Sequence, residues 1–320
     1  MKKFSSFIAP LIEEYIFYRK ASGCWNESSY EAILFLFDRY CLREYPDANK
    51  LSQEMVDKWC EKRSTESNNS CISRIYPVVS FIRYLTQHGK ADITTPAVPR
   101  KQPRGYVPHS FTETELQNFF QACDNINGTL TVGQRDQKIT VPVFFRLLYS
   151  SGIRTVEARL LRHKDVDLKS GVLNVRYSKG NDQHFVVLHD TMLELMRAYN
   201  AVITRTYPNR TYFFPARKDK CHTGSWVQKN FRKMWDEKNK SYATAYELRH
   251  HYAIENINRW TGEGLDFHAK LLYLSKSMGH YTIESTKYYY SLVPNLADIL
   301  REKTNDSFNN IIPEVKNEAI

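Results

Sequence analysis

The chain has 320 residues, which is enough for two folded domains, and its 42% hydrophobic and 25% charged residues are ordinary for a globular protein. No apolar run approaches the ~20 residues of a membrane-spanning helix, and Glu13 and Glu14 interrupt the N-terminal stretch that begins like a signal peptide. The formal net charge of +10 fits a polyanionic partner, although basic surfaces also occur on proteins that bind no nucleic acid.

The six cysteines are scattered and form no Cys-x-x-Cys pair. Cys221 and His222 are adjacent but have no second pair at zinc spacing, which argues against a structural metal. Scattered cysteines in a long chain are typical of free thiols in a reducing compartment, so we expect a cytoplasmic protein without a metal site.

The N-terminal third predicts a helical domain, which we assign to residues 1–89. Apolar stripes with the i, i+3, i+4, i+7 spacing of helices cover residues 4–16, 30–41, 55–60 and 72–85. Pro77 falls inside the last stripe, where we expect a kink or a later helix start.

Residues 90–110 predict a linker that combines four prolines with basic residues. Two interpretations stay open for it: a solvated connection, or a tether that lies along the phosphate backbone of a nucleic acid.

The second domain is assigned to residues 111–303, followed by a polar tail at 304–320. Thr112 and Glu115 predict a capping box before its first helix, and a strongly apolar helix ends at Gly152. Short strands are predicted over residues 165–168, 172–177 and 184–188, and further helices over residues 191–204, 226–237, 246–259, 267–277 and 283–300. The fold class is therefore mainly α with a small antiparallel β-sheet. A sheet this small, without a glycine-rich loop, argues against a nucleotide cofactor.

The second domain also carries five residues that suit the cleavage of a phosphodiester: Arg154, Lys179, Arg249, His280 and Tyr289. Two guanidinium groups and an ammonium group neutralise a phosphate in the transition state, and a histidine moves or donates protons. A tyrosine hydroxyl attacks phosphorus and holds the phosphate covalently.

The local contexts of these residues resemble the motifs of the tyrosine recombinase (phage integrase) family. The matching segments read Ser-Gly-Ile-Arg-Thr-Val-Glu around Arg154, Ser-Lys-Gly around Lys179, Tyr-Glu-Leu-Arg-His around Arg249, and Met-Gly-His before Tyr289. The resemblance covers essentially the whole chain, with specific motifs in residues 146–295. It implies a SAM-like four-helix core-binding domain and an α+β catalytic domain.

The resemblance also implies a mechanism. Tyr289 attacks the DNA phosphate to form a 3′-phosphotyrosyl link, and Lys179 protonates the leaving 5′ oxygen. Arg154, Arg249 and His280 stabilise the phosphorane charge, and Glu157 braces the first arginine. The exchange of one phosphoester for another needs neither ATP nor a metal ion.

Tyr246 departs from the family pattern, which usually has a histidine there. We nevertheless include Tyr246 among the catalytic residues, because a phenol can hydrogen-bond the phosphate. His250 and His251 point away from the helix face that bears Tyr246 and Arg249, by ~100° and ~200°, so we expect them to be structural. In the family a Thr-Thr or Ser-Thr pair is followed by two residues and then the tyrosine, so the resemblance assigns the nucleophile to Tyr289 rather than Tyr288 or Tyr290.

The implied partners are double-stranded DNA and three further copies of the chain, with the tail docking on a neighbouring copy. Mobile-element integration and excision is the first functional hypothesis. Resolution of chromosome or plasmid dimers, a type IB topoisomerase-like nicking activity and a non-catalytic DNA-binding role stay open as alternatives.

Overall fold

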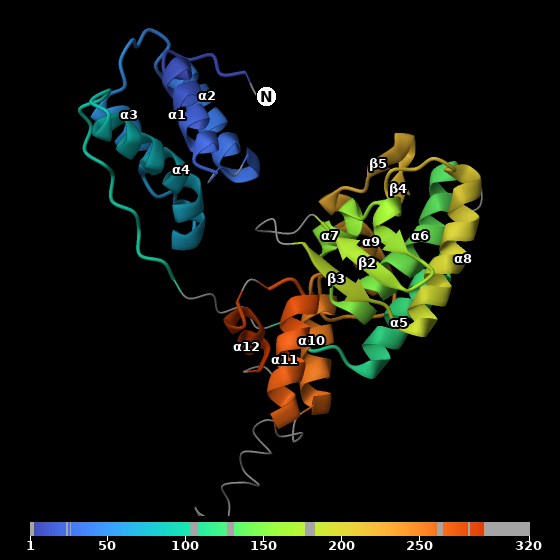
Figure 1. Ribbon diagram of the computed structural model, residues 1–320. Coiled ribbons are helices and arrows are strands. Elements are labelled where there is room, and N and C mark those ends of the chain that lie inside the picture. The colour runs from blue at the N-terminus through green and yellow to red at the C-terminus, as the bar shows by residue number, and fades with distance from the viewer. Residues whose placement is uncertain are drawn as a thin grey trace, which may run out of the picture. The chain divides into compact units, whose positions relative to one another are not determined.

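The computed structural model describes residues 3–23, 25, 27–102, 108–126, 131–176, 183–260, 265–280 and 282–290. The chain divides into two compact units, Met1–Tyr106 and Val107–Ile320 (Figure 1). Each unit has its own buried apolar cluster and is described by itself.

The described part of the N-terminal unit is helical. Its elements are α1 (Ala9–Ala21), a π-helical turn (Glu27–Glu31), α2 (Ala32–Glu44), α3 (Gln53–Cys60) and α4 (Asn68–Gln87). Helix α1 begins later than the apolar stripe predicts, with Pro10 in its first turn, yet Phe4 and Ile8 ahead of it are buried. Helix α4 begins at Asn68 and continues through Pro77, so the alternative of a later helix start was wrong.

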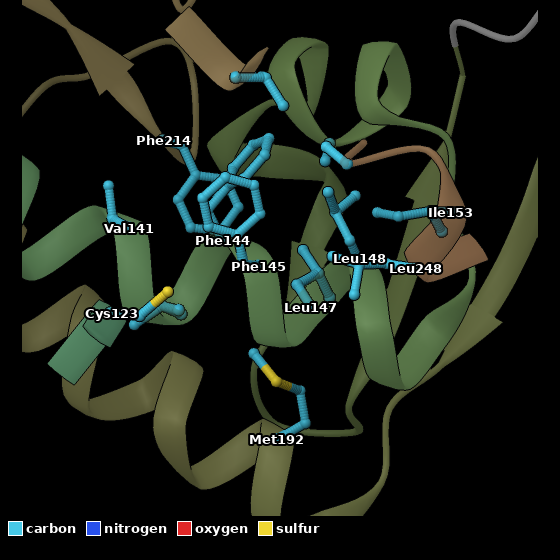
Figure 2. Close-up of a cluster of buried hydrophobic side chains, with 14 of the residues drawn as sticks. Cys123, Val141, Phe144, Phe145, Leu147, Leu148, Ile153, Met192, Phe214 and Leu248 are labelled. Carbon is cyan, nitrogen blue, oxygen red and sulfur yellow. The ribbon is translucent and has the colours of Figure 1, made fainter. Parts of the chain in front are cut away.

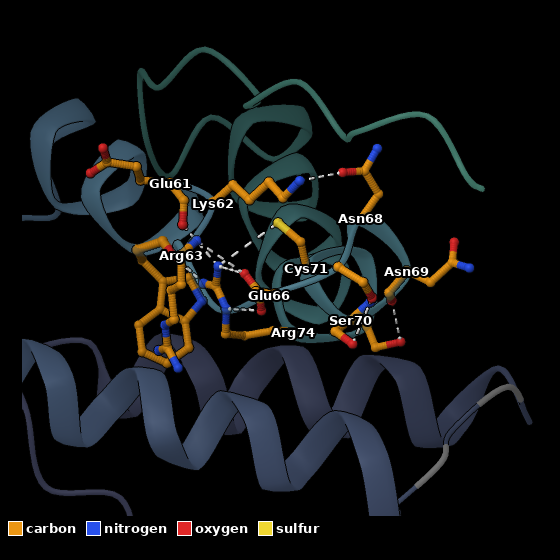
Figure 3. A network of polar contacts seen from close by, with 12 residues as sticks. Glu61, Lys62, Arg63, Glu66, Asn68, Asn69, Ser70, Cys71 and Arg74 are labelled. Carbon is orange, nitrogen blue, oxygen red and sulfur yellow. Dashed lines mark hydrogen bonds and ion pairs between the residues drawn. The ribbon is translucent and has the colours of Figure 1, made fainter.

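A buried ion pair holds the loop between α3 and α4 (Figure 3). The side chains of Arg74 and Glu66 are each only 10% exposed, with 2.8 Å between Nη2 and Oε2. The same guanidinium donates to the backbone carbonyls of Trp59 and Glu61. Because a buried charge is tolerated only when it is paired and hydrogen-bonded, this network fixes the path of the loop.

The first part of the predicted linker is anchored on the N-terminal unit. Ile93 is buried in the apolar cluster of this unit. The side-chain amides of Asn68 and Asn69 donate to the carbonyls of Arg100 and Gln102, at 3.3 and 2.8 Å. The segment up to Gln102 is therefore attached to α4 rather than solvated along its whole length.

The C-terminal unit combines helices with two small antiparallel sheets. Its helices are α5 (Glu113–Asp124), α6 (Val132–Ser151), α7 (Thr155–Leu160), α8 (Asp190–Thr206), α9 (Gly224–Trp235), α10 (Glu247–Trp260), α11 (Leu265–Ser277) and α12 (Glu284–Tyr290). The first sheet has the order β1 (Val166–Asp167), β2 (Val172–Val175) and β3 (His184–Val187). This architecture confirms the predicted fold class, and the capping box of Thr112 and Glu115 is present.

The second sheet was not predicted. It is a hairpin of β4 (Pro215–Ala216) and β5 (Lys220–Cys221), and its tip places Lys218 and Asp219 at positive φ angles. Strands of two residues carry no alternating apolar pattern, so this hairpin leaves little signal in a sequence.

The core of the C-terminal unit gathers on α6, which contacts α8 and α10 (Figures 1 and 2). Phe144 and Phe145 are fully buried there. Ile153 and Leu248, which directly precede Arg154 and Arg249, are also buried in this cluster. The core thus anchors the backbone on which both arginines stand. No helix in the described ranges has the length and apolarity needed to cross a bilayer.

Candidate active site

Arg154 stands at the junction between α6 and α7. The chain leaves α6 through Gly152, whose φ of 63° is left-handed, and a Cβ there would lie 2.2 Å from Cδ1 of Tyr252. Arg154 then occupies the N-cap position of α7, and it makes two hydrogen bonds to the Glu157 carboxylate. Glu157 accepts from the Arg154 backbone N at 2.7 Å and from its Nη1 at 2.6 Å. The Glu157 side chain is fully buried, so it fixes both the turn and the guanidinium.

Arg249 lies in the first turn of α10 and is 2% exposed. It donates from Nη1 to the Gly152 carbonyl at 2.6 Å and from Nη2 to the Met278 carbonyl at 2.8 Å. Burial lowers the pKa of Arg249, and the positive charge of Arg154 lowers it further. Carbonyl acceptors orient this guanidinium without cancelling its charge, so Arg249 is suited to an anion, whereas the Glu157 carboxylate offsets part of the charge of Arg154.

The end of α11 holds both arginines at once. Gly279 adopts a φ of +62° and His280 N donates to the Ser275 carbonyl at 2.9 Å, which is a Schellman-type helix end. In this turn the Met278 carbonyl accepts from Arg249, and the next carbonyl, of Gly279, accepts from Arg154 Nη2 at 2.9 Å. The turn therefore fixes the spacing of the two guanidinium groups.

His280 follows this turn, and both of its ring nitrogens have partners. Nε2 lies 2.9 Å from Nη2 of Arg249, and Nδ1 lies 2.7 Å from Oγ1 of Thr286. Because a guanidinium only donates, Nε2 is the acceptor, and we assign the ring proton to Nδ1. Burial, and then the charges of Arg249 and Arg154, lower the pKa of His280 to about 3. His280 is therefore neutral at physiological pH.

Tyr289 on α12 is 3% exposed and stacks on His280, with 6.1 Å between ring centroids and 11° between ring planes. It packs in a small apolar cluster with Ala253 and Met278 among others. Burial raises the pKa of Tyr289, and the neighbouring charge of Arg249 opposes this shift. The side chains of Tyr288 and Tyr290 lie outside the described residues. The structure thus brings Tyr289 to the two arginines and His280.

Tyr246 directly precedes α10 and is 40% exposed. Its ring meets the His250 ring edge to face, with 5.0 Å between centroids, and the His250 ring lies 5.4 Å from the Tyr289 ring. The sequence argument placed His250 away from the site because of its angular offset from the helix face that bears Tyr246 and Arg249. Tyr246 and His250 are four residues apart, or about one helical turn, and that spacing was the signal that it overlooked.

Two other histidines have different surroundings. His251 stacks on Tyr149, at 5.5 Å between centroids, and contacts the Phe111 ring. His184, at the start of β3, was missed by the sequence argument. Its Nε2 lies 4.0 Å from Oε2 of Glu157, and a Cβ on Gly279 would lie 2.5 Å from its Cε1. The contacts of His184 with Glu157 and Gly279 join distant segments, so no local sequence motif predicts them.

Lys179 lies outside the described residues, between the end of β2 at Val175 and the start of β3 at His184. Its role remains a prediction from the sequence. Within the described ranges, no group of three or more His, Cys, Asp or Glu side chains is placed to hold a metal ion.

Comparisons with known proteins show which proteins this chain is similar to. The sequence model described as the phage integrase family matches residues 109–295. The chain is 26% identical over 299 residues to y4rE of Sinorhizobium fredii, which is named as an integrase/recombinase, covering 90% of this chain and 93% of that protein. It is 25% identical over 231 residues to tyrosine recombinase XerC of Oceanobacillus iheyensis, covering 70% of each.

Solved structures share the fold. XerH site-specific recombinase bound to a palindromic difH substrate has a TM-score of 0.60 at 16% identity, covering 87% of this chain and 78% of that chain. A lambda integrase dimer bound to a core site has a TM-score of 0.56 at 14% identity, covering 88% and 76%. Because the match to the family's sequence model spans more than half of the chain, this protein belongs to the phage integrase family and is a tyrosine-type site-specific recombinase.

Proposed function

We propose that this recombinase cuts and rejoins duplex DNA in the cytoplasm through a 3′-phosphotyrosyl intermediate on Tyr289, in the integration and excision of a mobile element. The observation that supports this chemistry most is the convergence of Arg154, Arg249, His280 and Tyr289. They come from four separate segments of the chain and meet around one turn at Met278 and Gly279.

The proposed reaction has two transesterifications. The Tyr289 oxygen attacks phosphorus, the bond to the 5′ oxygen breaks, and Lys179 is our candidate for the proton donor to that oxygen. The 5′ hydroxyl of another strand then attacks the phosphotyrosyl link and releases Tyr289. The phosphorane charge meets Arg154 and Arg249, and each such donor contributes ~2.7–4 kcal/mol by analogy with oxyanion holes. Bond energy is conserved, so no nucleotide is consumed.

The active assembly is proposed to be a tetramer on DNA. One of the solved structures that this chain resembles is a lambda integrase tetramer bound to a Holliday junction, with a TM-score of 0.57 at 14% identity. The net charge of +10 favours contact with DNA phosphates. Residues 304–320, outside the described ranges, are our candidate for the segment that docks on a neighbouring copy.

A trapping experiment tests this proposal without knowledge of the DNA site. The full-length protein is mixed with a random pool of nicked duplexes, in which the short strand released by cleavage diffuses away. We expect covalent complexes that survive denaturant and that share one sequence. Covalent complexes without sequence preference, together with relaxation of supercoils, would instead indicate a topoisomerase-like enzyme. DNA binding without any covalent complex would indicate a non-catalytic relative.

A further inference from the structure

The residue directly before α10 is Tyr246, which has no imidazole, and His250 provides an imidazole one turn further along the helix. Tyr246 stands where the family resemblance expects a histidine. His250, one turn further along α10, contacts the rings of both Tyr246 and Tyr289. It is 8% exposed, which places an imidazole beside the nucleophile in a site largely shielded from water.

We propose that His250 accepts the proton of the Tyr289 hydroxyl during DNA cleavage and that Tyr246 positions its ring. This inference rests on the proposed recombinase function and names the proton acceptor of the same site.

The other histidine next to Tyr289, His280, is bonded at both ring nitrogens. His280 stacks on the phenol ring, but its Nε2 accepts from Arg249 and its Nδ1 is bonded to Thr286. To take a proton from Tyr289, His280 would have to break one of these bonds. His250 approaches the phenol from another direction, with its ring plane tilted by 52° to the Tyr289 ring.

The separation of 5.4 Å between the His250 and Tyr289 ring centroids means that the two side chains are in contact. Proton transfer then requires a rotation of the imidazole, or of the phenol on phosphate binding, that brings nitrogen and oxygen within hydrogen-bond distance. Catalytic hydrogen bonds are often longer in the free enzyme and tighten in the complex with substrate.

The protonation state of His250 agrees with this role. Burial and the charge of Arg249 lower the pKa of His250 to about 4, so its free base predominates at neutral pH but is a weaker base than an ordinary imidazole. A bound phosphate offsets the charge of Arg249 and thereby makes the imidazole more basic in the complex. Tyr246, on the more exposed side of the ring, limits the orientations that His250 can adopt.

The proton and bond changes balance. The bond between Tyr289 Oη and phosphorus forms while the bond between phosphorus and the 5′ oxygen breaks. The phenol proton moves to an imidazole nitrogen of His250, which becomes an imidazolium. The leaving 5′ oxygen takes its proton from a separate donor. In the rejoining step the imidazolium returns the proton to the departing Tyr289 oxygen.

Single-turnover cleavage of a nicked substrate, taken from the sequences trapped above, tests the assignment. His250→Gln keeps a side chain that hydrogen-bonds but accepts no proton, so we expect cleavage to slow by about 10²–10⁴-fold while DNA binding is unchanged. Adding Tyr246→His to His250→Gln returns an imidazole to the site and should restore the rate by at least about tenfold. His251→Gln is the matched control on the same helix and should cleave like the unmodified protein.

Two results would overturn the proposal: cleavage by His250→Gln at the unmodified rate, or a double variant no faster than His250→Gln alone. If His250→Gln lowers the unfolding temperature or weakens DNA binding, His250→Asn replaces it in the same comparison. If the unmodified protein traps no DNA, the proposed function itself fails. If it traps DNA and His250→Gln does so equally fast, only the role of His250 fails.

Discussion

Arg249 donates to the His280 ring, with 2.9 Å between the guanidinium Nη2 and the imidazole Nε2. This bond engages Nε2 as an acceptor, and Thr286 engages Nδ1. His280 therefore has no ring N–H to offer a phosphate oxygen until one of these bonds changes. A phosphate that competes for the Arg249 guanidinium would loosen this bond, which couples substrate binding to the orientation of His280.

Removal of the Tyr289 hydroxyl should abolish covalent attachment to DNA and leave binding nearly unchanged. The side chain is buried, and a phenylalanine ring keeps its contacts with His280. Covalent complexes of Tyr289→Phe are measured by denaturing electrophoresis, with Tyr288→Phe and Tyr290→Phe as controls. A complex that survives in Tyr289→Phe but disappears in a control variant would assign the nucleophile to another tyrosine.

Arg249→Ala should slow cleavage by about 10²–10³-fold, the loss associated with one oxyanion donor. Tyr246→Phe should be milder, because Tyr246 is 40% exposed and the phenylalanine ring keeps its contact with His250. Tyr246→His should retain cleavage. Single-turnover rates of the three variants provide the measurement, and equal losses in Tyr246→Phe and Arg249→Ala would give the Tyr246 hydroxyl an essential role.

Gly279→Ala should reduce both stability and cleavage. The φ of +62° alone costs about 1–2 kcal/mol for a residue with a Cβ, and that Cβ would also lie 2.5 Å from the His184 ring. Gly89→Ala is the control, because Gly89 has a φ of +65° with nothing within 4 Å of its Cβ position. Chemical denaturation should show a larger loss of unfolding free energy for Gly279→Ala. Equal losses would mean that the His184 contact is readily relieved.

The ion pair of Glu66 and Arg74 should make the N-terminal unit sensitive to acid. Its hydrogen bonds from Arg74 lower the pKa of Glu66 to about 2, below the value of about 4.3 expected in the unfolded chain. A depressed carboxyl pKa stabilises the fold above the unfolded value, and this contribution is lost as the pH falls from about 4.3 to 2. Hydrogen exchange of α4 amides in the whole chain measures it.

Glu66→Gln provides the comparison for this pH dependence. The variant should exchange its α4 amides faster than the unmodified protein at pH 6, and the difference should shrink as the pH approaches 2. A difference that stays constant over this range would show that the carboxylate charge contributes nothing to the stability of α4.

The sequence predicted the helices and the three-stranded sheet well, because their apolar spacings and caps are local. It also identified Arg154, Arg249, His280 and Tyr289 as a group, from motifs that each span a few residues. It did not predict that Arg154 would bond to the Gly279 carbonyl, 125 residues away. It also did not predict that the His184 ring would lie directly against Gly279. Those contacts depend on how the core packs, and a single sequence does not report which distant segments meet.

Errors at the local level also have physical causes. Helix α1 starts at Ala9 although apolar residues begin at Phe4, because a buried side chain can also come from a non-helical turn ahead of a helix. His250 was expected to point away from the face bearing Tyr246 and Arg249, yet its ring contacts the rings of Tyr246 and Tyr289. Residues four apart lie about one helical turn from each other, so Tyr246 and His250 can be in contact although an offset measured by angle alone separates them.

The turn at Met278 and Gly279 lies late in the sequence, so it is synthesised after the two arginines that it holds. The N-terminal unit and Arg154 leave the ribosome well before the carbonyls that hold Arg154 and Arg249 in place. A growing or truncated chain that ends before this turn therefore lacks the two carbonyls that fix the guanidinium groups. The proposed phosphate site would be complete only after the segment that also carries Tyr289 has folded against α10.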